Sequence, residues 1–289
     1  MDTISNTFSK LSFCFLLLLF CQCEMGNDNQ QVVEQGPEIA DEQATVDSSA
    51  SLTSTEESTP LIREEIQQFE VKNPLPKWPA KRDFREYKLY PFDEAVNDES
   101  LLRFRQQLYE AVKRRNVSHL LASCSDKIKF SFGMENGKSA FIESWKLDKP
   151  QADTSGIWTE LENVLSLGGA FIDPDKEVFL APYQSVVDDF TDPFSEGVIT
   201  GENVRLRDQP SVEGKIIASL SWDKVSIIFQ DNAKSETIGG QTHYWEKVRN
   251  AKEQIGYVWG KYLGYSAGYR AAFEKEEGEW KMVTFIAGD

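Results

Sequence analysis

The sequence predicts an α+β fold, in which a helix-and-strand body domain is followed by a small all-β barrel inserted before a C-terminal β-hairpin. Three observations predict it. Apolar residues recur at helical spacing between residues 99 and 166. Short β-branched and aromatic runs, separated by turn residues, occupy residues 197–263. The last strand is apolar on both faces and therefore needs cover on both sides.

The N-terminus carries a targeting signal. Lys10 precedes the apolar run 11–20, which is too short to cross a bilayer as a helix but typical of a signal peptide. A cysteine at the end of such a run resembles a bacterial lipoprotein signal, so residues 1–23 are interpreted as a lipoprotein-type signal peptide. Cys23 and Cys21 are the candidate lipidation sites. The resemblance implies a protein of the cell envelope, lipid-anchored to a membrane and facing the periplasm or the surface; an ordinary secretory signal with incidental cysteines is the alternative.

Residues 24–68 are expected to form a disordered acidic tether. The part up to residue 62 holds nine acidic residues, no Lys or Arg and no aromatic residue, so it cannot bury enough apolar surface to fold. The whole chain has a net charge of −16. Such a surface repels phosphates, and no nucleic-acid partner is expected.

The body domain is assigned to residues 69–195. A helix is predicted over about 99–115 and another within residues 154–169, where Thr154 or Ser155 can cap the start and Gly168 and Gly169 end it; each has one apolar stripe. The stripes consist of Leu101, Phe104, Leu108 and Val112, and of Ile157, Trp158, Leu161, Val164 and Leu165. Between the two helices, Lys127–Phe132 is predicted to be a strand.

The barrel is assigned to residues 196–265. Its most telling stretch is "ENVRLRDQPS", residues 202–211. Alternation places Val204 and Leu206 on one face and Arg205 and Arg207 on the other, so the arginines belong to a strand and not to a recognition loop.

Residues 197–263 resemble bacterial SH3-like domains. The matching runs are "GVITGENVRLRDQPSVEGKIIASL", "KVSIIF", "YWEKVRN" and "IGYVWGKYL". The polar stretch Asp231–Trp245 departs from the family as a longer loop than it usually needs. The layout as a whole, with its ending Trp280–Asp289, is similar to uncharacterised SH3-domain-containing lipoproteins of the Bacteroidetes type, which bring no known activity. The resemblance implies a binding module, often for peptidoglycan or peptides.

The chain ends in a predicted β-hairpin within residues 266–289. Its strands are Tyr269–Glu274 and Trp280–Ala287, with Gly278 in the turn. Because a lone hairpin cannot cover a strand that is apolar on both faces, the hairpin is expected to pack on the body domain.

Catalytic signals are sparse. Cys124 is the one cysteine of the region beyond residue 23, and the two histidines are His119 and His243. No thiol-catalysis or zinc motif surrounds them, so no catalytic residue, no metal and no cofactor is expected. A pair of acids could still make a glycosidase. Glu143, Glu160 and Asp173 are candidates, although nothing in the sequence marks a pair.

The barrel aromatics are the stronger binding candidates. Trp222, Tyr244 and Trp259 are expected to be exposed and to form a groove that stacks on sugars or peptide side chains. The alternative is that they pack against the body domain. The sequence therefore favours a non-enzymatic envelope lipoprotein that binds peptidoglycan or an envelope protein or peptide partner. A wall-active glycosidase and a purely structural assembly protein are the alternatives.

Overall fold

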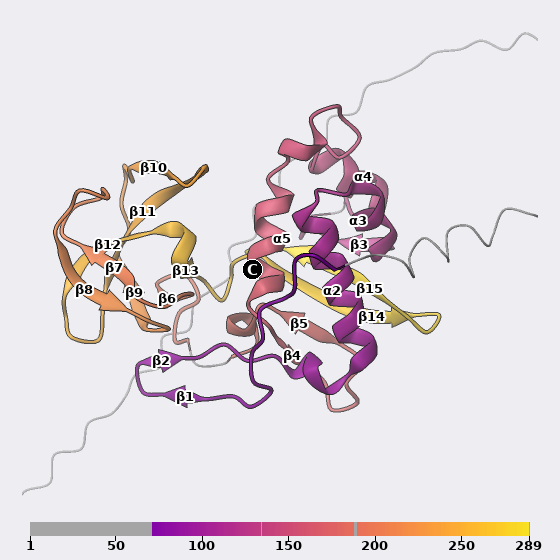
Figure 1. The fold of residues 1–289 in the computed structure, drawn as a ribbon, viewed down its shortest axis with the longest axis horizontal. Helices are drawn as coiled ribbons and strands as arrows, with labels where there is room; N and C mark the ends of the chain where they lie inside the picture. Colours follow the sequence, from indigo (N-terminus) through magenta and orange to yellow (C-terminus); the bar gives the residue numbers. More distant parts are fainter. Residues whose placement is uncertain (1–70, 134, 188–189, 289) are drawn as a thin grey trace, which may run out of the picture. The chain divides into compact units, whose positions relative to one another are not determined.

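A computed structural model describes residues 71–133, 135–187 and 190–288 (Figure 1). These residues form a mixed α+β structure of four α-helices and three sheets. The predicted signal peptide, with Cys21 and Cys23, and the predicted tether lie outside the described residues.

The body is built on a five-stranded sheet whose order is β3-β15-β14-β5-β4. The strands are β3 (Cys124–Lys129), β4 (Ala170–Phe171), β5 (Phe179–Ala181), β14 (Arg270–Glu276) and β15 (Glu279–Ile286). β14 and β15 form the predicted hairpin, and Gly278 has a φ of +87° in its turn. β15 pairs in parallel with β3, and β14 pairs antiparallel with β5. The last two strands thus complete a sheet begun before residue 182.

Local packing explains this pairing. Trp280, Met282, Phe285 and Ile286 are all buried, so β15 contributes side chains from both of its faces. The strand β3 begins three residues earlier than predicted, at Cys124, and ends before Phe132, which is 54% exposed. The shift arises because β3 pairs with β15 from Cys124 onward, a contact that local periodicity does not reveal.

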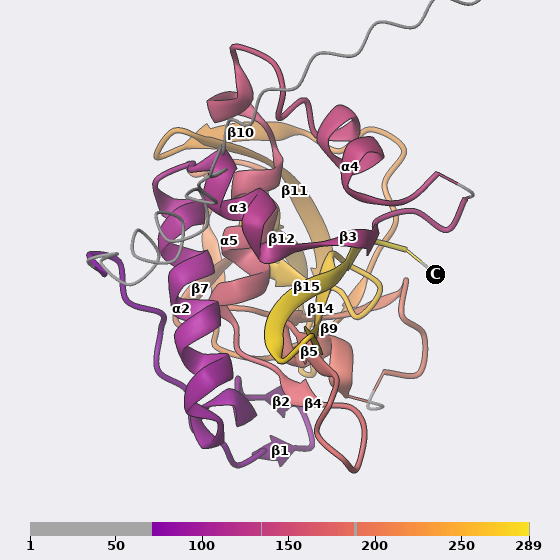
Figure 2. The same ribbon diagram turned by 90° about the vertical axis from the view of Figure 1, so that its right-hand side faces the viewer.

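Helices cover the body sheet. They are α2 (Glu99–Lys113), α3 (Val117–Ser123), α4 (Lys138–Ser144) and α5 (Ile157–Ser166). The predicted stripes on α2 and α5 are buried in the same core as Phe273 and Phe285 of the sheet, apart from Phe104, which is partly buried against it. Figure 2 shows α2, α3 and α5 together on one side of β14 and β15.

An eight-stranded antiparallel sheet is formed by the segment between β5 and β14. Its strands are β6 (Glu196–Ile199), β7 (Val204–Arg207), β8 (Ile216–Leu220), β9 (Lys224–Ile227), β10 (Ser235–Ile238), β11 (Gln241–Arg249), β12 (Ile255–Trp259) and β13 (Leu263–Gly264). The order runs β13-β6-β9-β11-β12-β7-β8, with β10 paired to β11. Val204 and Leu206 enter its core, whereas Arg205 is exposed and Arg207 half-buried, as the alternation predicted.

The stretch Asp231–Trp245 is not the long loop that the sequence suggested. It contains β10 and the start of β11, which pair as a hairpin from Ser235↔Tyr244 to Ile238↔Gln241. Gly239 and Gly240 make the turn with φ values of +60° and +82°, which glycine adopts without strain.

Residues 71–92 tie the two large sheets together. They include β1 (Phe84–Arg85) and β2 (Lys88–Leu89), a short hairpin. Lys88 Nζ lies 3.0 Å from the Asp223 carboxylate, and Leu89 N donates to Trp222 O at 2.9 Å. Tyr183 donates its hydroxyl to the Leu89 carbonyl at 3.0 Å.

Arg105 of α2 is held by a buried ion pair with Asp93 and by a hydrogen bond to α5. Arg105 Nη1 lies 2.7 Å from both carboxylate oxygens of Asp93, and Arg105 Nη2 donates to Leu165 O at 3.1 Å. Arg105 is fully buried. Asp93 is the N-cap residue of the short helix η1 (Glu94–Asn97), so the ion pair joins η1 to α2, and the hydrogen bond to Leu165 adds α5.

In the described ranges, none of the helices combines the length and the apolar character that a bilayer span requires.

Candidate functional site: a pocket beside helix α5

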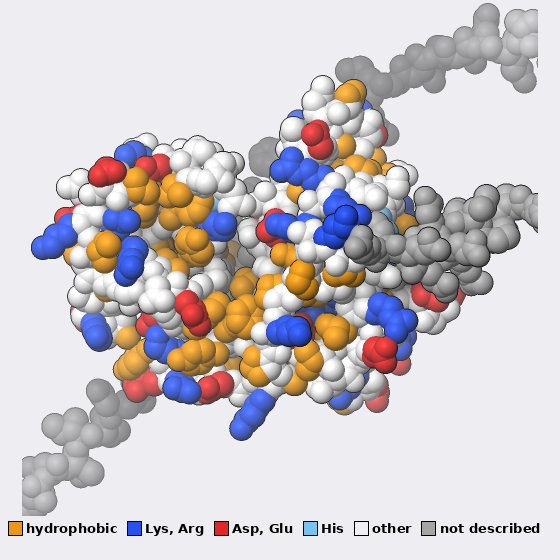
Figure 3. All heavy atoms as spheres, viewed as in Figure 1, with side chains coloured by type: hydrophobic (Ala, Val, Ile, Leu, Met, Phe, Trp, Pro, Cys, Tyr) orange, Lys and Arg blue, Asp and Glu red, His pale blue; other side chains and the backbone are white. Residues whose placement is uncertain are grey.

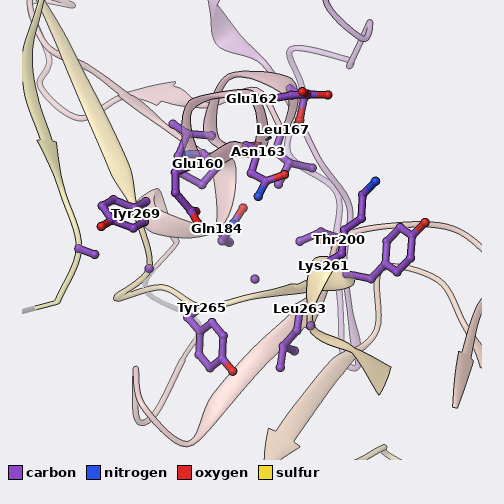
Figure 4. Close-up of a pocket in the computed structure, with 18 of the residues that line it drawn as sticks. Glu160, Glu162, Asn163, Leu167, Gln184, Thr200, Lys261, Leu263, Tyr265 and Tyr269 are labelled. Carbon is purple, nitrogen blue, oxygen red and sulfur yellow. Dashed lines mark hydrogen bonds between the residues drawn. The ribbon is translucent and has the colours of Figure 1, made fainter. Parts of the chain in front are cut away.

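A pocket of about 410 Å³ lies where α5 meets the end of the eight-stranded sheet. Figure 4 shows it in close-up. Its lining comes from α5, from the short helices η3 (Tyr183–Val186) and η4 (Gly260–Tyr262), from β13, and from residues 265–269 leading into β14. A volume of this size holds a small ligand or one group of a larger one.

One face of α5 forms a wall of the pocket. Glu160, Asn163 and Leu167 are spaced three and four residues apart, so they lie on the same face of α5, with Leu167 at its C-cap. The neighbouring face carries Ile157, Leu161 and the rest of the buried stripe. The helix that anchors the body core therefore presents a second, more polar face to the pocket.

The carboxyl group of Glu160 is half-buried and has no hydrogen-bond or ion-pair partner among the described residues. Burial raises its pKa above the ordinary value of a glutamate. Its neighbour Glu162 differs, because Glu162 Oε1 lies 2.7 Å from Lys113 Nζ. Glu160 is thus a partly desolvated acid without a cation.

Gln184 contributes a buried amide to the same pocket. The residue is 4% exposed, and its Oε1 accepts no hydrogen bond from any described residue. Gly264 makes room for it, because a Cβ on Gly264 would stand 2.8 Å from Gln184 Nε2. Figure 4 shows the side chains of Glu160, Asn163 and Gln184 converging on one side of the pocket.

The other walls are aromatic and weakly basic. They include His243, Lys261, Tyr262, Tyr265 and Tyr269. Lys261 Nζ lies 5.8 Å from the Tyr262 ring centroid and forms no ion pair with a described acid. Burial, with a smaller contribution from the positive charge of Lys261, lowers the pKa of His243, so its imidazole is neutral at pH 7.

Two of the three aromatic residues chosen for exposure are buried. Trp222 is 7% exposed and Trp259 is 6% exposed, so the expected groove of three exposed rings is wrong. Trp222 packs edge-on against Trp78, with ring centroids 5.5 Å apart. Trp259 packs edge-on against His243 at 4.9 Å. Tyr244 is 58% exposed, as expected.

Two other aromatic residues of this segment are exposed, and the sequence did not predict their exposure. Phe229 is 85% exposed and follows β9, and Tyr262 is 37% exposed at the pocket. Trp222 is buried because residues 71–92 cross the sheet there, a contact between residues 144 positions apart that no local pattern signals.

The candidate acids are not brought together. Glu143 lies on α4 and Asp173 in the turn between β4 and β5, where its carboxylate accepts hydrogen bonds from Glu177 N and Val178 N. Of the three, Glu160 alone lines the pocket.

Cys124 is a buried free thiol. The residue is 1% exposed, and burial raises its pKa to about 12. The thiol is therefore protonated at pH 7, which is the opposite of what a nucleophile requires. His119 is half-buried on α3, and burial lowers its pKa.

Some charged side chains elsewhere form ion pairs. Arg82 lies 3.1 Å from Glu94, and Arg85 lies 2.9 Å from Asp83. Figure 3 shows basic and acidic side chains mixed over the visible face. Across the described ranges, no group of three or more His, Cys, Asp or Glu side chains could hold a metal ion.

The sequence did not identify the pocket. Glu160 was named as one acid among several, and Gln184 carried no signal, because a single glutamine after a short strand is ordinary. No family model, no curated protein and no solved structure matches this chain.

Proposed function

We propose that this chain is a non-enzymatic cell-envelope lipoprotein that binds peptidoglycan, and that the pocket beside α5 receives the bound group. The observation that carries the proposal is a buried acceptor without a donor among the described residues, Gln184 Oε1, in the same pocket as the half-buried Glu160 carboxyl, which has no partner among them. Buried acceptors without donors are uncommon in folded proteins and point to a missing hydrogen-bond partner. A ligand with several donors supplies that partner.

The proposal includes an SH3-like barrel over residues 196–265. Its support is that each of the four runs that carry the resemblance contains all or part of at least one strand of the eight-stranded sheet. The pocket uses η4 and β13 at the end of the last run, so a ligand there contacts both this module and α5. The lipid anchor and the tether, outside the described residues, remain part of the proposal through the sequence of residues 1–68.

The test is retention on purified sacculi. The full chain, in mild detergent, is sedimented with sacculi and compared with an unrelated protein of similar net charge. Asn163→Trp places a large ring on the pocket face of α5 and should abolish retention. Thr159→Trp adds the same ring to the same helix at a position that does not line the pocket, and it should leave retention unchanged.

The retention results distinguish the ligand from the binding site. Absence of wild-type retention would reject peptidoglycan as the ligand and favour a protein partner or a structural role. Equal loss in both tryptophan variants would reject the pocket as the binding site. Thermal melting of both variants separates loss of binding from loss of folding.

A glycosidase is the second candidate, and one observation favours it. The raised pKa of Glu160 suits a general acid, which must hold its proton near neutral pH. The second carboxylate is the weak point, because Glu162 is engaged by Lys113. Release of reducing sugar ends from sacculi by the wild type, abolished in Glu160→Gln, would establish this alternative.

A further inference from the structure

We propose that the pocket recognises a primary ammonium group, seated between the Glu160 carboxylate and Gln184 Oε1. The inference rests on the proposed binding function and names the group that is recognised. Free amino groups of stem peptides are the source that fits a peptidoglycan ligand.

The first argument is that the Glu160 carboxyl has no cation or hydrogen-bond donor among the described residues. Most of the other buried or half-buried acids in the described ranges hold cations or donors; Glu246 and Glu274 are exceptions, and neither lines the pocket. Glu110 accepts from Arg114 and Asn73, Asp93 holds Arg105, and Asp223 holds Lys88. Glu160 has none of these, although it is half-buried at a pocket wall. A carboxylate that has lost part of its hydration gains most from a ligand that carries positive charge.

The second argument is the position of Gln184 Oε1. It is a buried acceptor, and its residue lines the same pocket as Glu160. Figure 4 draws the Gln184, Glu160 and Asn163 side chains on the same side of the pocket. An ammonium group offers three N–H donors and no acceptor. It can therefore donate to Glu160, to Gln184 and to one further acceptor or water.

The third argument is the balance of charge around Glu160. The titratable groups lining the pocket are Glu162 on α5, His243 on β11, Lys261 and Tyr262 on η4, and Tyr265 and Tyr269 near β14. Lys113 neutralises Glu162, and the lowered pKa of His243 keeps the imidazole uncharged. Figure 4 places Lys261 on the opposite side of the pocket from Glu160. The wall at Glu160 is therefore the anionic end of the cavity.

An anionic or neutral ligand fits this wall less well. A carboxylate or phosphate would meet the charge of Glu160 and the lone pairs of Gln184 at once. A hydroxyl group brings one donor and so satisfies only one of the two acceptors. Compared with these groups, an ammonium group satisfies both acceptors and also neutralises the acid.

The test compares native sacculi with sacculi whose amino groups have been acetylated. Acetylation removes the positive charge and leaves the glycan intact. We expect acetylation to weaken retention of the wild-type full chain about tenfold. Glu160→Gln should weaken retention on native sacculi to a similar degree and should be insensitive to acetylation. Glu162→Gln is the matched control, because that carboxylate already has Lys113, and it should retain its dependence on acetylation.

A small probe tests the same contact without peptidoglycan. Glycinamide, a primary amine, should shift the side-chain amide resonances of Gln184 in an NMR titration, and N-acetylglycinamide should not. Equal retention on native and acetylated sacculi, or normal binding by Glu160→Gln, would overturn ammonium recognition while leaving peptidoglycan binding in place. Absence of all retention together with a glycinamide shift at Gln184 would reject the peptidoglycan source and keep the ammonium site. Absence of both effects would reject both.

Discussion

Replacing Gln184 by methionine should stabilise the free protein, which is the reverse of the usual result for a buried substitution. The Gln184 side chain is almost fully buried and makes no hydrogen bond with a described residue. Methionine has a similar length and no polar atom that needs a donor. The substitution therefore removes an unmet desolvation penalty and breaks no hydrogen bond.

The expected size follows from the penalty for one unpaired buried polar group, about 1–3 kcal/mol. Imperfect fitting of the new side chain offsets part of this gain, since shape changes in packed sites commonly cost up to about 1.5 kcal/mol. A net stabilisation of about 1 kcal/mol remains. For a domain of this size, 1 kcal/mol raises Tm by roughly 2–4 °C.

Thermal unfolding of the full chain measures the effect, with Gln106→Met as the matched control. Gln106 Oε1 accepts from Leu75 N at 2.8 Å, and Gln106 Nε2 donates to Asn73 O at 2.9 Å. The control should therefore be destabilised by about 1–3 kcal/mol. If Gln184→Met were destabilised as much as Gln106→Met, the Gln184 amide would be satisfied in the free protein, and the main support for the ligand site would fail.

Three further predictions concern the surrounding structure. Arg105→Met should destabilise the fold by about 3–5 kcal/mol, because it leaves a buried carboxylate unpaired, whereas Arg103→Met on the same helix breaks an exposed pair and should cost less than about 1 kcal/mol in urea unfolding. Cys124 should react with a thiol reagent at pH 8 only after denaturation, since it is buried with a pKa near 12; rapid reaction of the native protein would contradict its burial. Because the folded-state pKa of Glu160 is raised, the folded protein binds the proton more tightly than the unfolded chain, so this group lowers stability as pH rises above about 4.5. The stability of Glu160→Gln relative to the wild type should therefore increase between pH 4 and pH 7, and a difference independent of pH would refute the assignment.

The helices could be predicted from the sequence because their signal is local. Leu101, Leu108 and Val112 repeat at the spacing of one helical face, and α2 begins at Glu99 as predicted. The hairpin of β14 and β15 could also be predicted, because Gly278 marks a turn between two strand-forming runs, which pair antiparallel. The exposure of the aromatic residues in the eight-stranded sheet could not be predicted in this way. Trp222 and Tyr244 look alike as isolated rings in a β-rich segment, and only the path of residues 71–92 buries the first and leaves the second exposed.

The sequence by itself determined the α+β character, the positions of the main helices, the alternation in "ENVRLRDQPS" and the return of the last strands to the body. Each of these depends on periodicity, on turn residues, or on a strand too apolar to stand alone. Only the tertiary structure decided the candidate site. Glu160, Gln184 and Gly264 come from three elements, with 104 positions between the first residue and the last, and their meeting depends on how α5, η3 and β13 pack. The absence of a partner for a carboxyl or an amide is a property of that packing, and no single stretch of sequence contains it.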